Sequence, residues 1–75
     1  MPKLRRMSGR ELRRILEQHG FVLVRQKGSH MILQKRSDTG SRTVPVPDHD
    51  EIRIGTLMSI IRQSGLDRAL FEANP

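Results

Sequence analysis

Apolar side chains recur with a helical spacing near both ends of the 75-residue chain and with a strand-like spacing in its middle. The first helical stripe has the i, i+3, i+4, i+7 spacing of one helix face and consists of Leu12, Ile15, Leu16 and His19. Ser8 and Glu11 ahead of it have the spacing of a capping box, and Gly20 supplies a C-terminal stop. We therefore predict a helix over residues 9–19.

A second helical stripe lies in the last third of the sequence and consists of Ile54, Leu57, Met58 and Ile61. It predicts a helix that begins near Ile54 or Thr56 and ends at Gly65. One further short turn is predicted within residues 67–73.

Extended strands are predicted between the two helices. Phe21–Lys27 is rich in β-branched and apolar residues, and Met31–Leu33 resumes the apolar run after Gly28-Ser29. These segments predict a hairpin with a tight turn at Gly28-Ser29.

A third strand is predicted over Arg42–Val46, after turn-forming residues that fill positions 36–41. Because Pro45 has no N–H to donate, we expect this strand at an edge of the sheet. The order of elements predicts an α+β two-layer sandwich, in which a three-stranded antiparallel sheet carries both helices on one face. This α-β-β-β-α order matches the double-stranded-RNA-binding domain. We treat residues 1–75 as a single domain with a flexible basic lead over residues 1–6.

Charge is distributed unevenly along the chain. Fourteen Lys and Arg residues against eight Asp and Glu give a net charge of +6. Residues 1–47 hold eleven basic and three acidic side chains, whereas residues 48–75 hold three basic and five acidic ones. A basic half of this kind is typical of a polyanion binder, so we expect RNA as the first partner and an acidic protein as the second.

Composition also excludes several classes of protein. No apolar run approaches the roughly 20 residues of a membrane helix, so we expect a cytoplasmic protein without membrane contact. Cysteine is absent, which excludes a disulfide scaffold, a cysteine zinc site and a thiol nucleophile. Phe21 and Phe71 are the only aromatic residues, too few for a base-stacking platform. Recognition of RNA through its helical shape and its phosphates remains possible, because it needs no aromatic platform.

His30 is the strongest candidate for chemistry among the three histidines. It follows the predicted hairpin turn, with Arg25 and Lys27 on the preceding strand and Lys35 on the next. A histidine in a basic patch can transfer protons beside a bound phosphate, and the cations can stabilise charge on phosphoryl oxygens. RNA brings its own nucleophile, the 2′-OH, so we expect no cofactor. A plain hairpin histidine is the competing interpretation.

Two other site hypotheses fail on spacing. Ser29 and His30 are neighbours, and adjacent strand residues point to opposite faces, which disfavours a nucleophile–base pair. Asp48, Asp50 and Glu51 lack the spacing of a calcium loop, so we expect no metal site there. His19 is interpreted as a helix-packing residue and His49 as an exposed loop residue.

The combination of motifs resembles the HicA toxin family over about Ser8–Phe71. The resemblance rests on Ser8-Gly9-Arg10-Glu11-Leu12, Gly20-Phe21, Val24-Arg25-Gln26-Lys27-Gly28-Ser29-His30, Val44-Pro45-Val46, Gly55-Thr56-Leu57 and Ile60-Ile61-Arg62-Gln63 with Gly65-Leu66. The sequence departs from the family pattern at residues 47–50 and at Met58.

This resemblance implies a small ribonuclease of double-stranded-RNA-binding-like fold that cleaves messenger RNA. It implies that His30 is the catalytic histidine, that Gly28 and Ser29 form its turn, and that a HicB-like antitoxin covers this site. We expect Arg25, Lys27 and Lys35 to hold the scissile phosphate without a metal. The first helix would bind neighbouring phosphates through Arg10, Arg13 and Arg14. Two alternatives stay open: a non-catalytic RNA-binding module of the same fold, and a basic adaptor for an acidic protein.

Overall fold

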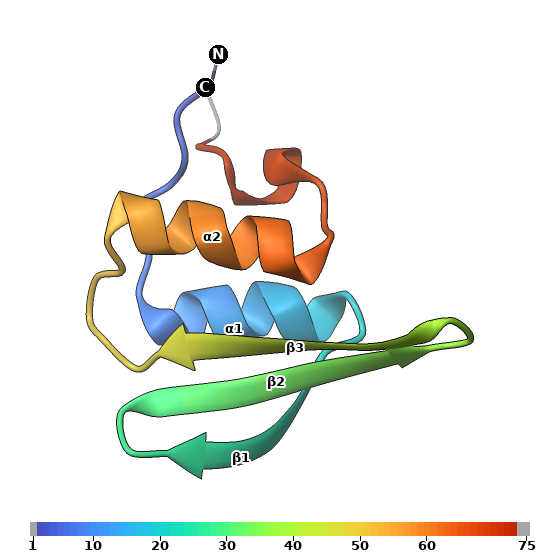
Figure 1. Ribbon diagram of the computed structural model, residues 1–75. Coiled ribbons are helices and arrows are strands. Elements are labelled where there is room, and N and C mark those ends of the chain that lie inside the picture. The colour runs from blue at the N-terminus through green and yellow to red at the C-terminus, as the bar shows by residue number, and fades with distance from the viewer. Residues whose placement is uncertain (1, 74–75) are drawn as a thin grey trace.

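Two helices cover one face of a three-stranded antiparallel sheet (Figure 1). The computed structural model describes residues 2–73. In chain order these form α1 (Gly9–Gln18), β1 (Val22–Lys27), β2 (His30–Ser37), β3 (Gly40–Pro47), α2 (Ile54–Ser64) and a short 3-10 helix, η1 (Arg68–Phe71). The strand order is β1-β2-β3, so β3 with its Pro45 lies at an edge. The predicted α-β-β-β-α order and two-layer α+β class are confirmed.

The core lies between the helices and the sheet. Its buried side chains come mainly from the two long helices and from two of the three strands: Leu12 and Leu16 of α1, Met31 and Leu33 of β2, Val44 and Val46 of β3, and Leu57 and Ile60 of α2. Both aromatic rings are buried among them, so neither Phe21 nor Phe71 is available to stack on a base. Within residues 2–73, neither helix has the length and hydropathy needed to cross a bilayer.

The capping box at the start of α1 is confirmed. The Ser8 hydroxyl accepts the Glu11 N–H at 3.1 Å, and the Glu11 carboxylate accepts the Ser8 N–H at 3.1 Å. The hydrogen bonds with Ser8, first that from its backbone N–H, hold the pKa of the Glu11 carboxyl below its usual value. This contribution to stability is therefore present at neutral pH and is lost as the pH falls through the lowered, folded-state pKa.

Residues 2–6 differ from the flexible lead predicted over residues 1–6, of which residue 1 lies outside the described residues. Leu4 is buried, and its neighbours pair with the C-terminal end of the chain. The Arg5 N–H donates to the Phe71 carbonyl at 2.8 Å, and the Ala73 N–H donates to the Lys3 carbonyl at 2.8 Å. A charged composition suggested an exposed tail, but the single apolar side chain at position 4 anchors the segment to the core.

The β2–β3 turn is also shorter than predicted. Paired strands continue to Ser37 and resume at Gly40, which leaves only Asp38 and Thr39 between them. The hairpin tip extends beyond the helices (Figure 1). The turn-like residues at 36–41 are compatible with a ribbon exposed on both faces, and Gly40 accommodates a φ of +136° next to the turn.

Ser8→Ala should lower the free energy of unfolding by about 1 kcal/mol, because the Glu11 N–H loses its acceptor. For a domain of this size the melting temperature should fall by about 4–8 °C. Thermal unfolding followed by circular dichroism measures the change. Ser8→Asn, which retains a capping oxygen, should recover most of the loss; equal loss in both variants would contradict the capping role.

Candidate active site

A β-bulge at Val24 determines which way the basic residues of β1 point. Leu23 pairs with Leu33 of β2, but Arg25 pairs with the adjacent Ile32, so the register shifts by one residue between them. Residues directly opposite in an antiparallel pair share a face, and faces alternate along a strand. Leu23 therefore shares the helix-covered face with buried Leu33, whereas Arg25 shares the open face with Ile32.

The same register places Lys27 beside His30. These two residues are cross-strand partners at the closed end of the β1–β2 hairpin. Because Met31 faces the core, His30 lies on the open face of the sheet, and Lys27 and Arg25 share that face with it. All three side chains are exposed, and neither cation forms a salt bridge with any residue of the described 2–73 range.

The turn that carries His30 is fixed by backbone geometry and by hydrogen bonds. Gly28 occupies the first central position of a two-residue turn with a φ of +59°, a sign typical of the type II′ hairpin. The Ser29 carbonyl accepts the Asp48 N–H at 2.7 Å, which ties the turn to the end of β3. The Gln26 side-chain amide donates to the Gly28 carbonyl at 3.3 Å. Ser29 is thus a turn residue, as predicted.

Two of the three arginines of α1 lie at this same end of the molecule. Arg10 forms an ion pair with Asp48 at 3.8 Å, and Asp48 is bonded to Ser29 of the turn. Arg13 lies 3.9 Å from the sulfur of Met31, the residue after His30, and also pairs with Glu17 at 3.3 Å. Arg14 is exposed and takes no part in an ion pair among residues 2–73.

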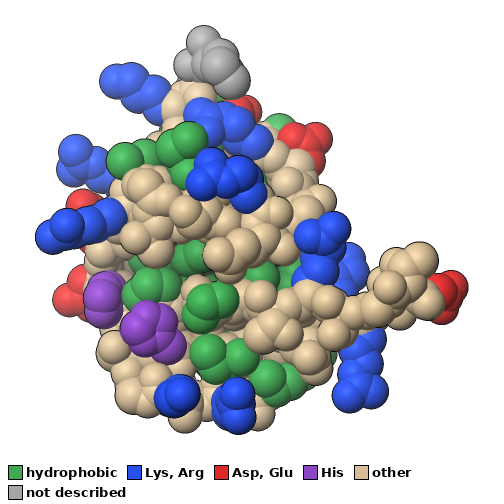
Figure 2. Space-filling model, viewed as in Figure 1, with side chains coloured by type: hydrophobic (Ala, Val, Ile, Leu, Met, Phe, Trp, Pro, Cys, Tyr) green, Lys and Arg blue, Asp and Glu red, His purple; other side chains and the backbone are tan. Residues whose placement is uncertain are grey.

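The start of α1 approaches β3 closely enough to require a glycine. A Cβ at Gly9 would overlap the Pro47 carbonyl, and the Gly9 N–H donates to the His49 carbonyl at 2.9 Å. This contact brings α1, the end of β3 and the hairpin turn together. Figure 2 shows histidine side chains (purple) at this end of the molecule, with basic side chains (blue) below them. His49, interpreted from sequence as a loop residue, therefore lies near the turn through a contact that spacing does not reveal.

Lys35 does not join this group. It lies five residues beyond His30 on β2, which corresponds to roughly 17 Å of strand and to the opposite face of the sheet. Its ammonium lies 6.0 Å from the centre of the Phe21 ring. The expectation that Lys35 shares the phosphate with Arg25 and Lys27 does not fit this geometry, because an odd separation along a strand reverses the face.

The sequence matches the family described as the HicA toxin of bacterial toxin–antitoxin systems over residues 9–66. The chain belongs to the HicA toxin family. A search of curated proteins returns no match. The HicA match runs from the first residue of α1 past the end of α2, so it includes the β1–β2 hairpin and His30. Membership identifies the protein as the toxin of a toxin–antitoxin pair and implies an antitoxin partner.

No metal-binding arrangement of three or more His, Asp or Glu side chains exists within the described part of this HicA chain, residues 2–73.

Gly28→Ala should destabilise the protein by about 1–2 kcal/mol, because an L-residue is strained at the positive φ of this turn. Gly55→Ala is the matched control, since a Cβ meets open space at both positions but Gly55 lies in α2. The control should leave stability unchanged or raise it by about 0.5 kcal/mol. Urea unfolding measures both; similar effects at the two glycines would contradict the strained-turn assignment.

Proposed function

We propose that this HicA-family toxin is an endoribonuclease that cleaves messenger RNA on the open face of its sheet. The observation that carries the proposal is the exposed group of His30, Lys27 and Arg25, placed on one face by the bulge in β1. Ribonuclease-like activity is what the family is known for, which supports this class of reaction. The messenger RNA substrate is inferred from the resemblance to the family, and the role of His30 from the family's turn motif together with this geometry.

The proposed reaction needs only RNA and the side chains of this hairpin. The ribose 2′-OH loses its proton as the 2′-oxygen bonds to phosphorus, and the P–O5′ bond breaks as the 5′-oxygen gains a proton. His30 acts as the general base or general acid in this exchange, with water as the other proton carrier. Lys27 and Arg25 stabilise the charge that develops on the phosphoryl oxygens.

The rest of the proposed RNA surface extends from the hairpin to α1. Gly28 and Ser29 form an exposed turn beside His30, and a side chain at Gly28 would meet nothing within 4 Å, so a phosphodiester can approach the backbone. Arg10, Arg13 and Arg14 continue the positive charge along the helix. Recognition would then depend on phosphates and the shape of the RNA backbone, because both aromatic rings are in the core.

The antitoxin partner is proposed to be HicB-like and to cover His30 with an acidic surface. Complementary charge speeds association, which suits the inhibition of a toxic enzyme. A messenger RNA substrate also implies that the protein works in the cytoplasm. The second candidate function, a non-catalytic RNA-binding module, is favoured by the likeness of the fold to the double-stranded-RNA-binding domain.

His30→Ala should reduce RNA cleavage by about 10²–10⁴-fold, the range typical of a lost proton-transfer group. Cleavage of a labelled messenger RNA by purified toxin measures the change, and circular dichroism verifies the fold. His49→Ala is the matched control, an exposed histidine at the same end of the molecule, and should cleave normally. Wild-type cleavage should persist in EDTA. Full activity of a folded His30→Ala protein would favour the non-catalytic module.

Replacing Arg10, Arg13 and Arg14 together with glutamine should flatten the dependence of log K for single-stranded RNA on log salt. The expected change is about 2 units, since each lost phosphate contact removes roughly 0.7. Fluorescence anisotropy at several salt concentrations, with the RNA made uncleavable by 2′-deoxy substitution, measures the slope. Replacing Arg53 and Arg62 of the C-terminal half should leave it unchanged. An unchanged slope in the α1 variant would restrict the RNA surface to the hairpin.

A further inference from the structure

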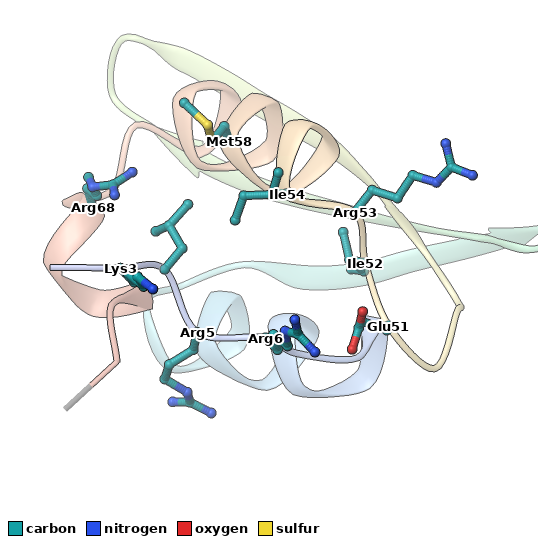
Figure 3. Close-up of a pocket in the computed structure, with 10 residues that line it drawn as sticks. Lys3, Arg5, Arg6, Glu51, Ile52, Arg53, Ile54, Met58 and Arg68 are labelled. Atoms are coloured by element: carbon teal, nitrogen blue, oxygen red, sulfur yellow. The ribbon is translucent and has the colours of Figure 1, made fainter. Parts of the chain in front are cut away.

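A pocket with a volume of about 670 Å³ lies between the N-terminal segment and the start of α2 (Figure 3). One wall consists of residues 3–6, which are fixed by their pairing with the C-terminal end of the chain. The other wall comes from residues 51–54 and from Met58 of α2, and Arg68 of η1 closes one end. This volume is within the range of sites that hold ligand groups or side chains.

The inner surface of the pocket is aliphatic. Leu4 and Ile52 are buried against the core, whereas Ile54 and Met58 remain 58% and 40% exposed. Ile54 and Met58 are two of the five large hydrophobic residues that stay exposed among residues 2–73, and both line this one concave site. Apolar side chains gathered in a concave site are typical of a surface that a partner covers.

The rim of the pocket is cationic. Lys3, Arg6 and Arg53 line it, and none of the three forms a salt bridge with a described residue. The other lining cations, Arg5 and Arg68, pair with Glu11 and Glu72, which lie outside the lining. Glu51 is the only acidic lining residue within the described range. The occupant should therefore carry negative charge around an apolar centre.

From this combination we infer that the pocket binds an acidic segment of a protein partner, with aliphatic side chains inserted between α2 and residues 3–6. RNA provides phosphates but no aliphatic groups, and the lining has no aromatic side chain on which a base could stack. A membrane surface cannot follow a concave wall. A segment in which carboxylate and aliphatic side chains alternate places carboxylates against the cationic rim and aliphatic groups against the inner surface.

The pocket is separate from the proposed catalytic face. The loop after β3 connects the two regions: the Asp48 N–H binds the Ser29 carbonyl of the hairpin turn at 2.7 Å, and four residues later the Ile52 N–H binds the Met7 carbonyl at 2.9 Å. No residue of the β1–β2 hairpin lines the pocket, so a segment held against Met58 leaves His30 open. Docking at this pocket anchors the partner without blocking RNA, and the inference stands whether or not the protein cleaves RNA.

The test uses a synthetic peptide of alternating leucine and glutamate, titrated into ¹⁵N-labelled full-length protein. Amide signals of Ile54, Gly55 and Met58 should shift, and a control peptide with serine in place of leucine should bind about tenfold more weakly or less. Met58→Glu and Arg6→Glu should each weaken binding by about tenfold or more. Met58→Leu should bind normally, and so should Arg36→Glu, a charge reversal on the open face of the sheet.

RNA cleavage by Met58→Glu without peptide should equal that of wild type, which separates this inference from the proposed function. Equal binding of the serine peptide, or shifts confined to residues 25–30, would overturn the inference and indicate nonspecific attraction to the hairpin. Shifts of the pocket amides with an RNA oligonucleotide or with anionic phosphatidylserine vesicles, and none with the leucine peptide, would also overturn it and identify the other class of occupant. Normal peptide binding by both Met58→Glu and Arg6→Glu would also overturn the inference.

Discussion

One extra residue in β1 determines both the core and the proposed active site. Side chains alternate between the two faces of a strand, so Leu23, Arg25 and Lys27 would all share one face in a regular strand. Leu23 faces the core opposite Leu33, and regular alternation would place both cations there as well. The bulge at Val24 reverses the alternation and puts the cations on the open face with His30. A desolvated, unpaired cation in so small a core would be strongly destabilising.

The two faces of the sheet consequently differ: one forms the core, and the other carries the proposed active site. One face supplies Met31, Leu33, Val44 and Val46 to a core that also takes both aromatic rings. The other face, which no helix covers (Figure 1), carries the basic side chains of β1 and His30 together with Ile32 and the exposed Val22. A small domain needs most of its large apolar residues for the core, which explains why the proposed RNA surface would depend on charge and backbone shape. The pocket beside α2 is a concave site at which the fold leaves Ile54 and Met58 exposed.

Local signals in the sequence predicted local structure well. The capping box at Ser8, the left-handed C-cap at Gly65 and the turn at Gly28 each depend on a few neighbouring residues, and all three are present in the structure. The hairpin that carries His30 could be predicted for the same reason. Gly65 also packs against Arg42, a contact between distant parts of the chain that no local pattern indicates.

Features that depend on distant residues could not be predicted. The bulge at Val24 is defined by its partners on β2, and nothing in the sequence of β1 separates it from a regular strand. The anchoring of Leu4 depends on the C-terminal end of the chain. The prediction that Lys35 lies with Arg25 and Lys27 failed for a simpler reason. It assumed that residues close in sequence also lie on the same face of the sheet. Strand periodicity alone could have corrected it.

We propose that RNA binds the open face of the sheet beside His30. An uncleavable 2′-deoxy RNA titrated into labelled protein tests it, with the side-chain signals of His30, Lys27 and Arg25 followed by NMR. We expect these three signals to shift together and the signal of Lys35, on the opposite face, to stay unchanged. Shifts confined to α2 and residues 3–6, with His30 unaffected, would contradict it.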